Sequence, residues 1–222
     1  MTLSRKLAAE FLGTAGLLSI VVGSGIMGER LADGNSAVAL LGNSIATGAG
    51  LIILIYGFSN ISGAHFNPVV TLVEAFDGKI GPIDGLRYLA AQIAGAVLGV
   101  IVANLMFELS AVNISTKTRA GEAQFLGEFV ATFGLIGVIR LGTTFHKKLV
   151  GAMVACYITA AYWFTSSTSF ANPAVTIARS LSNTFAGIAP SSVPLFIVAQ
   201  CAGATAAMLL FRWLLAEEDN DE

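Results

Sequence analysis

Few side chains in the apolar stretches of this chain can do chemistry. Glu10, His65 and Glu128 each lie within such a stretch, and so do both cysteines, Cys156 and Cys201. Buried acids and histidines can relay protons, whereas free cysteines in apolar surroundings usually act as small packing residues. These stretches hold no nucleophile paired with a base and no set of metal ligands, so we expect no enzyme, no catalytic residue, no metal and no cofactor.

Two Asn-Pro pairs, Asn67-Pro68 and Asn172-Pro173, also stand in apolar surroundings. Asparagine is a strong N-cap and proline favours the first turn, so each pair predicts the start of a helix. Each asparagine would cap with its oxygen and keep NH₂ donors for a passing solute. Each helix start carries about half a positive charge, which would oppose a cation. The extended segments 62–65 and 166–169 would line the path with carbonyl groups.

The elements that hold these residues must lie in a membrane. The chain has 222 residues, of which 55% are hydrophobic and 12% charged, and its mean hydropathy is +0.76. Soluble domains carry about 25% charged residues, and a soluble fold of this size cannot bury so much apolar surface. The composition also excludes a disordered chain, a coiled coil and a nucleic-acid-binding domain, while the net charge of −2 favours no polyanionic partner.

The gaps between charged residues predict six spans. A helix needs about 20 residues to cross the hydrocarbon core. Charge-free gaps run over residues 11–28, 34–73, 88–107, 149–178 and 180–211, and a sixth span covers about 124–141. The extra apolar pieces around Asn67 and Asn172 are too short to cross, so they predict re-entrant half-helices. The expected fold is an all-α membrane protein with six transmembrane helices and two half-helices.

An internal repeat relates the two halves of the chain. Three blocks match in the same order: residues 9–14 with 127–132, 67–71 with 172–176, and 91–96 with 199–204. Each half holds three spans, so the halves enter the membrane in opposite orientations and place a substrate path between them. We therefore expect a single domain over 1–222, with repeats over 7–107 and 122–215 and an acidic tail over 216–222.

The basic residues predict the orientation. With the N-terminus inside, the cytoplasmic side holds Arg5, Lys6, Lys79, Arg87, Arg140, Lys147, Lys148 and Arg212, and the other side holds Arg30, Lys117, Arg119 and Arg179. This excess supports cytoplasmic N- and C-termini in the inner (plasma) membrane. The first span imitates a signal peptide, but its match to a later span argues against cleavage.

The acids and the histidine each allow two interpretations. Glu10 and Glu128 are either charges at helix ends or buried groups that accept hydrogen bonds from a re-entrant loop, and we favour loop support. His65 is either a titrating gate or a neutral side chain bonded to a neighbouring backbone group.

Together these features resemble the aquaporin, or major intrinsic protein, family. The motifs are residues 62–68 (SGAHFNP) and 172–174 (NPA), with the flanking AEF and AQxAG blocks, and the resemblance runs roughly from Leu7 to Leu215. It implies a pore in each subunit, usually a homotetramer in the lipid bilayer, and passive flux of water or small uncharged solutes. The resemblance also implies that no cofactor is needed, and we expect no nucleic-acid partner. The pore motif residues would be Asn67, Pro68, Val69, Asn172, Pro173 and Ala174, with Val69 in place of the usual alanine.

The chain departs from the family at the outer constriction. In water channels this constriction carries an arginine, an aromatic residue and a histidine. The matching positions here are Val175, Thr47 and Ile158 (or Ala160), and the fourth wall, from the loop, is Ser169. Arg179 lies one turn beyond Val175. Such a filter would be wider, more apolar and uncharged, and a water-tuned filter is small and polar. It resembles the broad-pore aquaglyceroporins found beside bacterial arsenic-resistance genes, which implies glycerol-like solutes or arsenous acid.

Two other functions are weighed against this one. A water-selective aquaporin follows if other residues supply the constriction. A secondary transporter with inverted repeats would need proton-relay residues in mid-span, and only Glu10 and Glu128 qualify, both near span ends.

Overall fold

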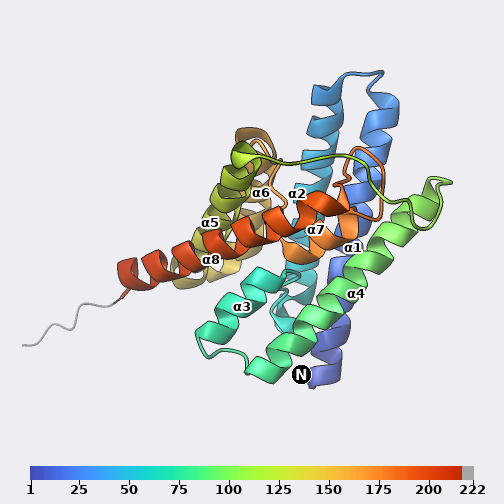
Figure 1. Cartoon of the computed structure of the whole chain (residues 1–222). Helices are drawn as coiled ribbons and strands as arrows, with labels where there is room; N and C mark the ends of the chain where they lie inside the picture. Colours follow the sequence, from blue (N-terminus) through green and yellow to red (C-terminus); the bar gives the residue numbers. More distant parts are fainter. Residues whose placement is uncertain (217–222) are drawn as a thin grey trace, which may run out of the picture.

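The computed structural model describes residues 1–216 of the chain, and the acidic tail expected at the C-terminus lies almost wholly outside the described residues. Within them the chain is helical (Figure 1). The helices are α1 (Leu3–Leu31), α2 (Ser36–Ser62), α3 (Pro68–Phe76), α4 (Pro82–Met106), α5 (Glu122–Phe145), α6 (Val150–Phe164), α7 (Pro173–Arg179) and α8 (Val193–Leu214). Short 3₁₀ turns, Lys147–Leu149 and Pro190–Ser192, precede α6 and α8.

Six of these helices are the predicted spans and two are the predicted half-helices. Helices α1, α2, α4, α5 and α8 are each long and apolar enough to cross a membrane. Helix α6 has only 15 residues, although none of them is charged. The half-helices α3 and α7 have nine and seven residues and begin at Pro68 and Pro173, as the Asn-Pro pairs predict. The fold therefore has the expected six spans and two half-helices.

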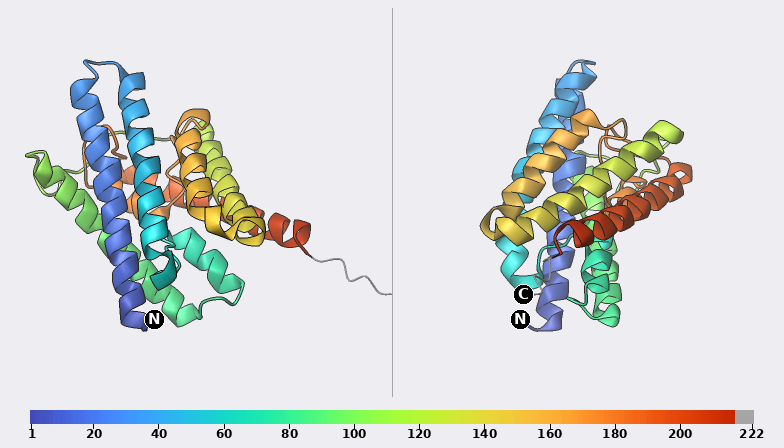
Figure 2. Two further views of the ribbon diagram at one scale, coloured as in Figure 1. Left: turned by 180° about the vertical axis from the view of Figure 1, so that it is seen from behind. Right: turned by 90° about the vertical axis from the view of Figure 1, so that its left-hand side faces the viewer.

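The two halves pack in the same way. Helix α1 lies against α2 and α4, α5 lies against α6 and α8, and α2 meets α6 between the halves (Figure 2). Close approach depends on Gly95 and Gly203, which occupy matching places in the AQxAG blocks. A Cβ atom at either glycine would clash with a backbone carbonyl of the facing helix, that of Phe11 or Phe129. Small residues allow helix backbones to approach in this way inside membranes.

The exposed surface of the helices is largely apolar. Ile53 on α2, Ile83 and Leu86 on α4 and Leu209 on α8 are at least 60% exposed. The interior instead contains many polar side chains, including fully buried acids and amides. A surface of this kind is suited to contact with lipid. The chain is thus built as a multi-pass membrane protein.

Candidate functional site

The two half-helices meet head to head, and their capping asparagines brace each other. Asn67 Oδ1 accepts a hydrogen bond from its own helix at 3.1 Å, and Asn172 Oδ1 does the same at 3.0 Å. Asn67 Nδ2 donates to the carbonyl oxygen of Ala171, and Asn172 Nδ2 donates to that of Phe66, each at 2.8 Å. An amide NH₂ has two hydrogens, so each asparagine retains one donor. Both side chains line one shared cavity.

The loop before each asparagine has the same unusual backbone. Ala64 and Phe66 have φ angles of 53° and 49°, and Ser169 and Ala171, at the matching places, have φ angles of 50° and 48°. Left-handed conformations in residues other than glycine cost about 1–3 kcal/mol each and persist only where the surroundings hold them. The two loops therefore need support from the helices behind them.

Buried acids provide that support. Glu10 accepts hydrogen bonds from the backbone N–H groups of His65 (3.0 Å) and Phe66 (2.7 Å). Glu128 accepts them from Phe170 (2.8 Å) and Ala171 (2.9 Å), which are the equivalent positions. Both acids are fully buried. Each carboxylate thus holds its loop in place through hydrogen bonds to backbone donors that would otherwise lack partners.

Two glutamines complete this support, and sequence reasoning missed their role. Gln92 Nε2 donates to Glu10 at 2.8 Å and to the hydroxyl oxygen of Thr71 at 2.9 Å. Gln200 Nε2 donates to Glu128 at 2.6 Å and to a threonine hydroxyl of α7 at 2.8 Å. Each glutamine thus links a supporting acid to a half-helix. The signal in the sequence is the glutamine in each AQxAG block, which matched as a repeat but did not reveal its partners.

His65 lies at one end of the cavity. Its ring nitrogen Nδ1 is 3.0 Å from the hydroxyl oxygen of Thr71, and its ring centroid is 5.4 Å from that of Tyr88. The partner of the ring is thus a side-chain hydroxyl, which corrects the expectation of a bond to a neighbouring backbone group. A hydroxyl can donate to or accept from a neutral imidazole, so this contact does not require a charged histidine.

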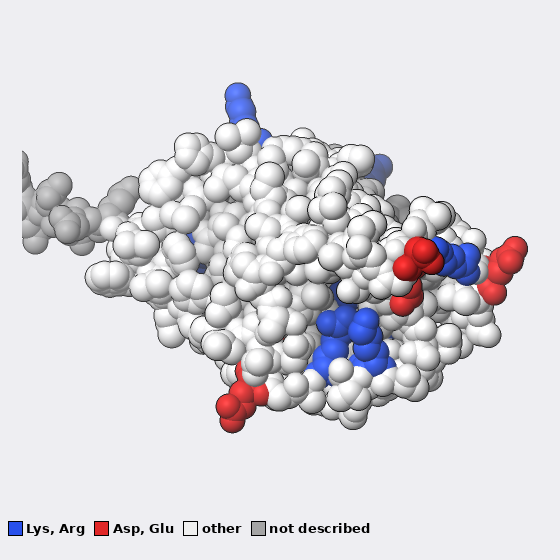
Figure 3. All heavy atoms as spheres, turned by 90° about the horizontal axis from the view of Figure 1, so that it is seen from above, with Lys and Arg blue, Asp and Glu red and all other residues white. Residues whose placement is uncertain are grey.

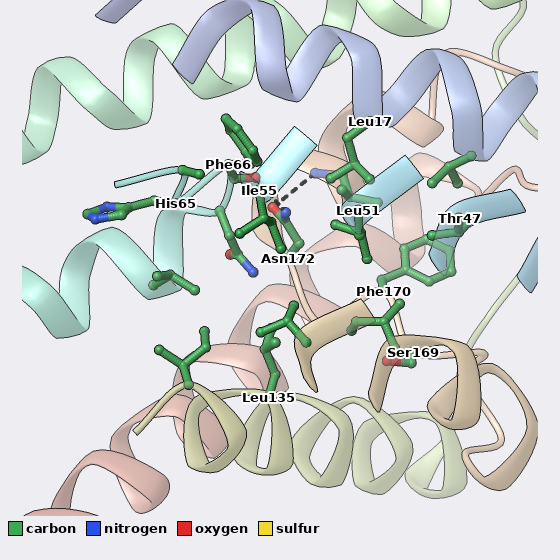
Figure 4. A pocket seen from close by; sticks show the side chains of 18 of the residues that line it. Leu17, Thr47, Leu51, Ile55, His65, Phe66, Leu135, Ser169, Phe170 and Asn172 are labelled. Atoms are coloured by element: carbon green, nitrogen blue, oxygen red, sulfur yellow. Dashed lines mark hydrogen bonds between the residues drawn. The ribbon is translucent and has the colours of Figure 1, made fainter. Parts of the chain in front are cut away.

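The shared cavity of about 240 Å³ runs past both asparagines. In Figure 4, His65 lies at one end, Asn172 near the middle, and Thr47 and Ser169 at the other end. We term these the inner and outer ends, after the predicted orientation. Most of the remaining wall is apolar and comes from Leu17, Val21, Leu51, Ile55, Leu135, Ile139, Val150 and Val154.

The residues predicted for the outer constriction all line this cavity, namely Thr47, Ile158, Ser169 and Val175, and Figure 4 shows Thr47 and Ser169 at its outer end. Of the two candidates on α6, Ile158 lines the cavity, whereas Ala160 is exposed on the outside of the helix. Tyr162 was not foreseen, and its hydroxyl lies 3.2 Å from that of Thr47. Tyr162 lies one helical turn after Ile158, a spacing that places both on one face of α6.

Arg179 also lines the outer part of the cavity, which corrects the expectation of an uncharged outer end. It lies four residues after Val175, so both fall on the same face of α7. The guanidinium carbon is 3.4 Å from the ring centroid of Phe170, and Nε donates to the carbonyl oxygen of Ala186. Only 2% of the residue is exposed. A positive charge and an aromatic ring therefore remain beside the small side chains Thr47 and Val175.

This geometry can guide an uncharged solute. The two helix starts and Arg179 place positive charge along the outer and middle cavity, which opposes cations. One free N–H on each asparagine can donate to a solute oxygen, while the apolar wall contacts its carbon groups. The hydrogen bonds that a solute loses with water are replaced at a few fixed points.

Comparison with known proteins identifies the family. The family model described as "Major intrinsic protein" matches residues 1–170. Aquaglyceroporin AqpS of Rhizobium meliloti (strain 1021) is 51% identical over 213 residues, which cover 96% of this chain and 91% of that protein. Aquaporin NIP1-1 of Arabidopsis thaliana is 30% identical over 168 residues, covering 69% of this chain and 54% of the relative.

The fold has a counterpart among solved structures. The X-ray structure of the aquaglyceroporin from Plasmodium falciparum superposes with a TM-score of 0.74 at 19% identity, and covers 95% of this chain and 96% of that one. The cavity, the paired half-helices and these matches lead to one conclusion. The chain belongs to the major intrinsic protein family and is a passive membrane channel for small solutes, not an enzyme.

Proposed function

We propose that the channel passes glycerol-sized neutral solutes, including metalloid hydroxides such as arsenous acid, together with water. The observation that carries this proposal is the outer end of the cavity, where Thr47 and Val175 are small residues. The 51% identity to a protein named aquaglyceroporin supports the same solute class. Arsenous acid is an uncharged trihydroxide similar in size to glycerol, so it presents hydroxyl groups of the same kind.

Thr47, Ile158, Ser169 and Val175 form the proposed selectivity constriction. The hydroxyl pair of Thr47 and Tyr162 offers a donor and an acceptor to a solute hydroxyl. Val175 and Ile158 offer apolar contacts to the carbon side of a polyol. A site that combines apolar walls with a few polar groups suits a solute with one apolar and one polar side.

The remaining assignments concern the assembly and its setting. We propose a homotetramer with one pore per subunit, in the inner (plasma) membrane, with both termini in the cytoplasm. The apolar surface of the outer helices supports contact with lipid and with further subunits. The division into repeats over 7–107 and 122–215 is supported by the matching contacts of Glu10 and Glu128.

A second candidate function is a water-selective aquaporin. The observation that favours it is that Arg179 and Tyr162 both line the shared cavity, since a fixed charge and a hydroxyl make it more polar than the sequence predicted. A small polar constriction holds water in preference to larger solutes. The two functions differ in whether glycerol passes at all.

Stopped-flow measurements on proteoliposomes separate these functions. We expect vesicles with the channel to take up glycerol and arsenous acid much faster than empty vesicles, and water as well. Rapid water flux with glycerol uptake equal to that of empty vesicles would overturn the proposal and establish the water-selective function. A matched control is the Cys156→Ser variant, because Cys156 lies on the exposed side of α6 and does not line the cavity.

A further inference from the structure

A second cavity of about 360 Å³ lies at the outer end of the pore, and three basic residues line it. Lys117 and Arg119 come from the connection between α4 and α5, and Arg179 comes from the end of α7. Figure 3 shows basic side chains gathered in a hollow on this face. We term this second cavity the vestibule. Arg179 lines both the vestibule and the pore cavity. The vestibule is thus the outer entrance of the pore.

Carbonyl groups, and not carboxylates, hold these three cations. Lys117 Nζ donates to the carbonyl oxygen of Phe185 at 2.8 Å. Arg119 donates through Nε to Gly187 at 3.0 Å and through Nη1 to Ser167 at 3.3 Å. Among residues 1–216 none of the three basic side chains forms a salt bridge. Their positions are therefore fixed without a direct salt bridge, and the acids Glu29 and Glu128 act on them only through longer-range attraction.

Each cation also keeps donors for a ligand. A lysine has three N–H donors and an arginine has five. Within the described residues Lys117 uses one of them, Arg119 uses two, and Arg179 uses one, on Ala186. The remaining donors belong to groups that line the same cavity. Arginine forks suit the geometry of oxyanions, and hydrogen bonds between charged partners are strong.

The cations also repel one another. Burial, and then the nearby charges of Arg119 and Arg179, lower the pKa of Lys117, and burial lowers the pKa of Arg119. The acid that acts against this effect at Lys117 is Glu29, which is exposed and accepts a hydrogen bond from the backbone N–H of Phe185 at 3.2 Å. An anion bound between the three cations would relieve this repulsion.

We propose that the vestibule binds a small oxyanion of two negative charges from solution, such as sulfate or hydrogen phosphate, and that the bound anion blocks the outer entrance. Two charges are favoured over one because three cations attract the ligand at short range. Blocking follows from position, since Arg179 is shared by the vestibule and the pore. The external anion concentration then controls the flux of neutral solutes.

A binding experiment tests the site independently of transport. The purified full chain in detergent is heated with sulfate or with chloride at equal ionic strength, and the unfolding temperature is compared. A ligand that binds the folded state raises this temperature. We expect sulfate to raise it more than chloride does for the unchanged chain, and this difference to shrink in the double variant Lys117→Gln/Arg119→Gln to the general stabilisation that sulfate gives any folded chain. Equal shifts with both salts, or a sulfate effect in the double variant as large as in the unchanged chain, would overturn the site.

Two single variants show whether a loss of sulfate binding comes from the lost charge or from misfolding. Lys117 lines the vestibule with part of its side chain but is an exposed residue as a whole, so Lys117→Gln should fold and weaken sulfate binding by roughly tenfold, the loss of one charge-assisted contact. The matched control is Arg30→Gln. Arg30 is predicted on the same side, donates to the carbonyl oxygen of Phe107 and lies outside the vestibule. An equal loss of binding in Arg30→Gln would show non-specific screening and contradict the proposal.

The blocking step rests on the proposed function and is measured as glycerol uptake by proteoliposomes with sulfate on both sides. At roughly ten times the sulfate dissociation constant of the unchanged chain, glycerol uptake should fall to about a tenth, and the tenfold weaker binding of Lys117→Gln should restore it to about half. Sulfate binding without this inhibition would contradict the proposed block of the pore, while the proposed binding site would still stand. A chain that passes no glycerol in the absence of sulfate would overturn the proposed function, while the binding experiment still decides the site.

Discussion

The two re-entrant loops share their framework and differ at the ends of the pore that they face. In each loop an asparagine caps the half-helix, a buried acid holds the backbone and a glutamine joins the two. Beyond this framework the first loop carries His65 and leads to Glu74, whereas the second carries Phe170 and leads to Arg179. The shared residues hold the path open, and the residues that differ determine what enters it.

The charges at the two ends differ in the same way. At the inner end Lys79 Nζ lies 3.0 Å from Glu74 Oε1, and Arg140 forms a salt bridge with Asp77. The acidic and basic side chains at this end therefore neutralise each other. At the outer end Lys117, Arg119 and Arg179 are paired only with carbonyl groups within residues 1–216. The outer half of the path is therefore the more positive half. We expect solute selection to depend mainly on this half.

The largest expected effect concerns the shared framework. Replacing Glu10 or Glu128 with alanine leaves two backbone N–H groups of a strained loop without partners, at about 1–3 kcal/mol each. Both variants should unfold at much lower temperature in detergent, to a similar extent, as followed by circular dichroism. A large loss in only one of them would show that the two loops are not equivalent.

Glutamine variants of the two acids distinguish their support of the loops from the effect of their negative charge. Glu10→Gln and Glu128→Gln keep an oxygen that can accept from the loop, so they should be more stable than the alanine variants. Their glycerol uptake in proteoliposomes should stay close to that of the unchanged chain, because neither acid lines the cavity. Loss of transport in a folded glutamine variant would instead indicate a carrier that relays protons.

A smaller loss of stability is expected at the matched glycines. A methyl group at Gly95 or Gly203 would meet a backbone carbonyl, which cannot move without separating two helices. Gly95→Ala and Gly203→Ala should each lower the free energy of unfolding by about 1–3 kcal/mol, the usual cost of overpacking. Gly57→Ala is the control, since a Cβ atom there meets nothing within 4 Å. Unequal losses at the two matched positions would contradict the shared packing.

At the outer end, Thr47→Phe should act on solute flux and not on folding. Thr47 is 2% exposed and lies beside Tyr162, so the larger ring narrows the constriction by volume alone. Glycerol uptake should fall by about tenfold while water flux falls less, as measured by stopped flow. Combining it with Val175→Arg should add little, because either change closes the same ring. Additive losses would show that the two residues do not share one constriction.

The smallest effect is expected for Tyr162→Phe, which removes one hydroxyl and keeps the ring. The Thr47 hydroxyl then loses its partner at 3.2 Å but remains in the pore. Glycerol uptake should change by about fivefold or less, the value of one neutral hydrogen bond of about 1 kcal/mol. A much larger loss would identify this hydroxyl as an essential contact for the solute.

The sequence was sufficient to predict the helices, the half-helices and the inverted repeat. Charge-free runs and Asn-Pro pairs are local signals, and each depends on only a few neighbouring residues. The charge at the outer end was not predictable in this way. Arg179 reaches the cavity because its side chain stacks on Phe170 and bonds to Ala186, and those contacts exist only after the loops have folded. Long side chains of this kind can lie far from where their spacing alone places them.

One measurement tests the central claim most directly, that the differing outer residues and not the shared framework select the solute. It is the ratio of glycerol to water permeability in proteoliposomes of the unchanged chain and of Val175→Arg. Val175 lines the outer cavity, and an arginine there would narrow it and add fixed donors. We predict a high ratio in the unchanged chain and a ratio at least about tenfold lower in Val175→Arg, with water flux largely kept. A ratio unchanged by the substitution, or already near zero in the unchanged chain, would contradict the account.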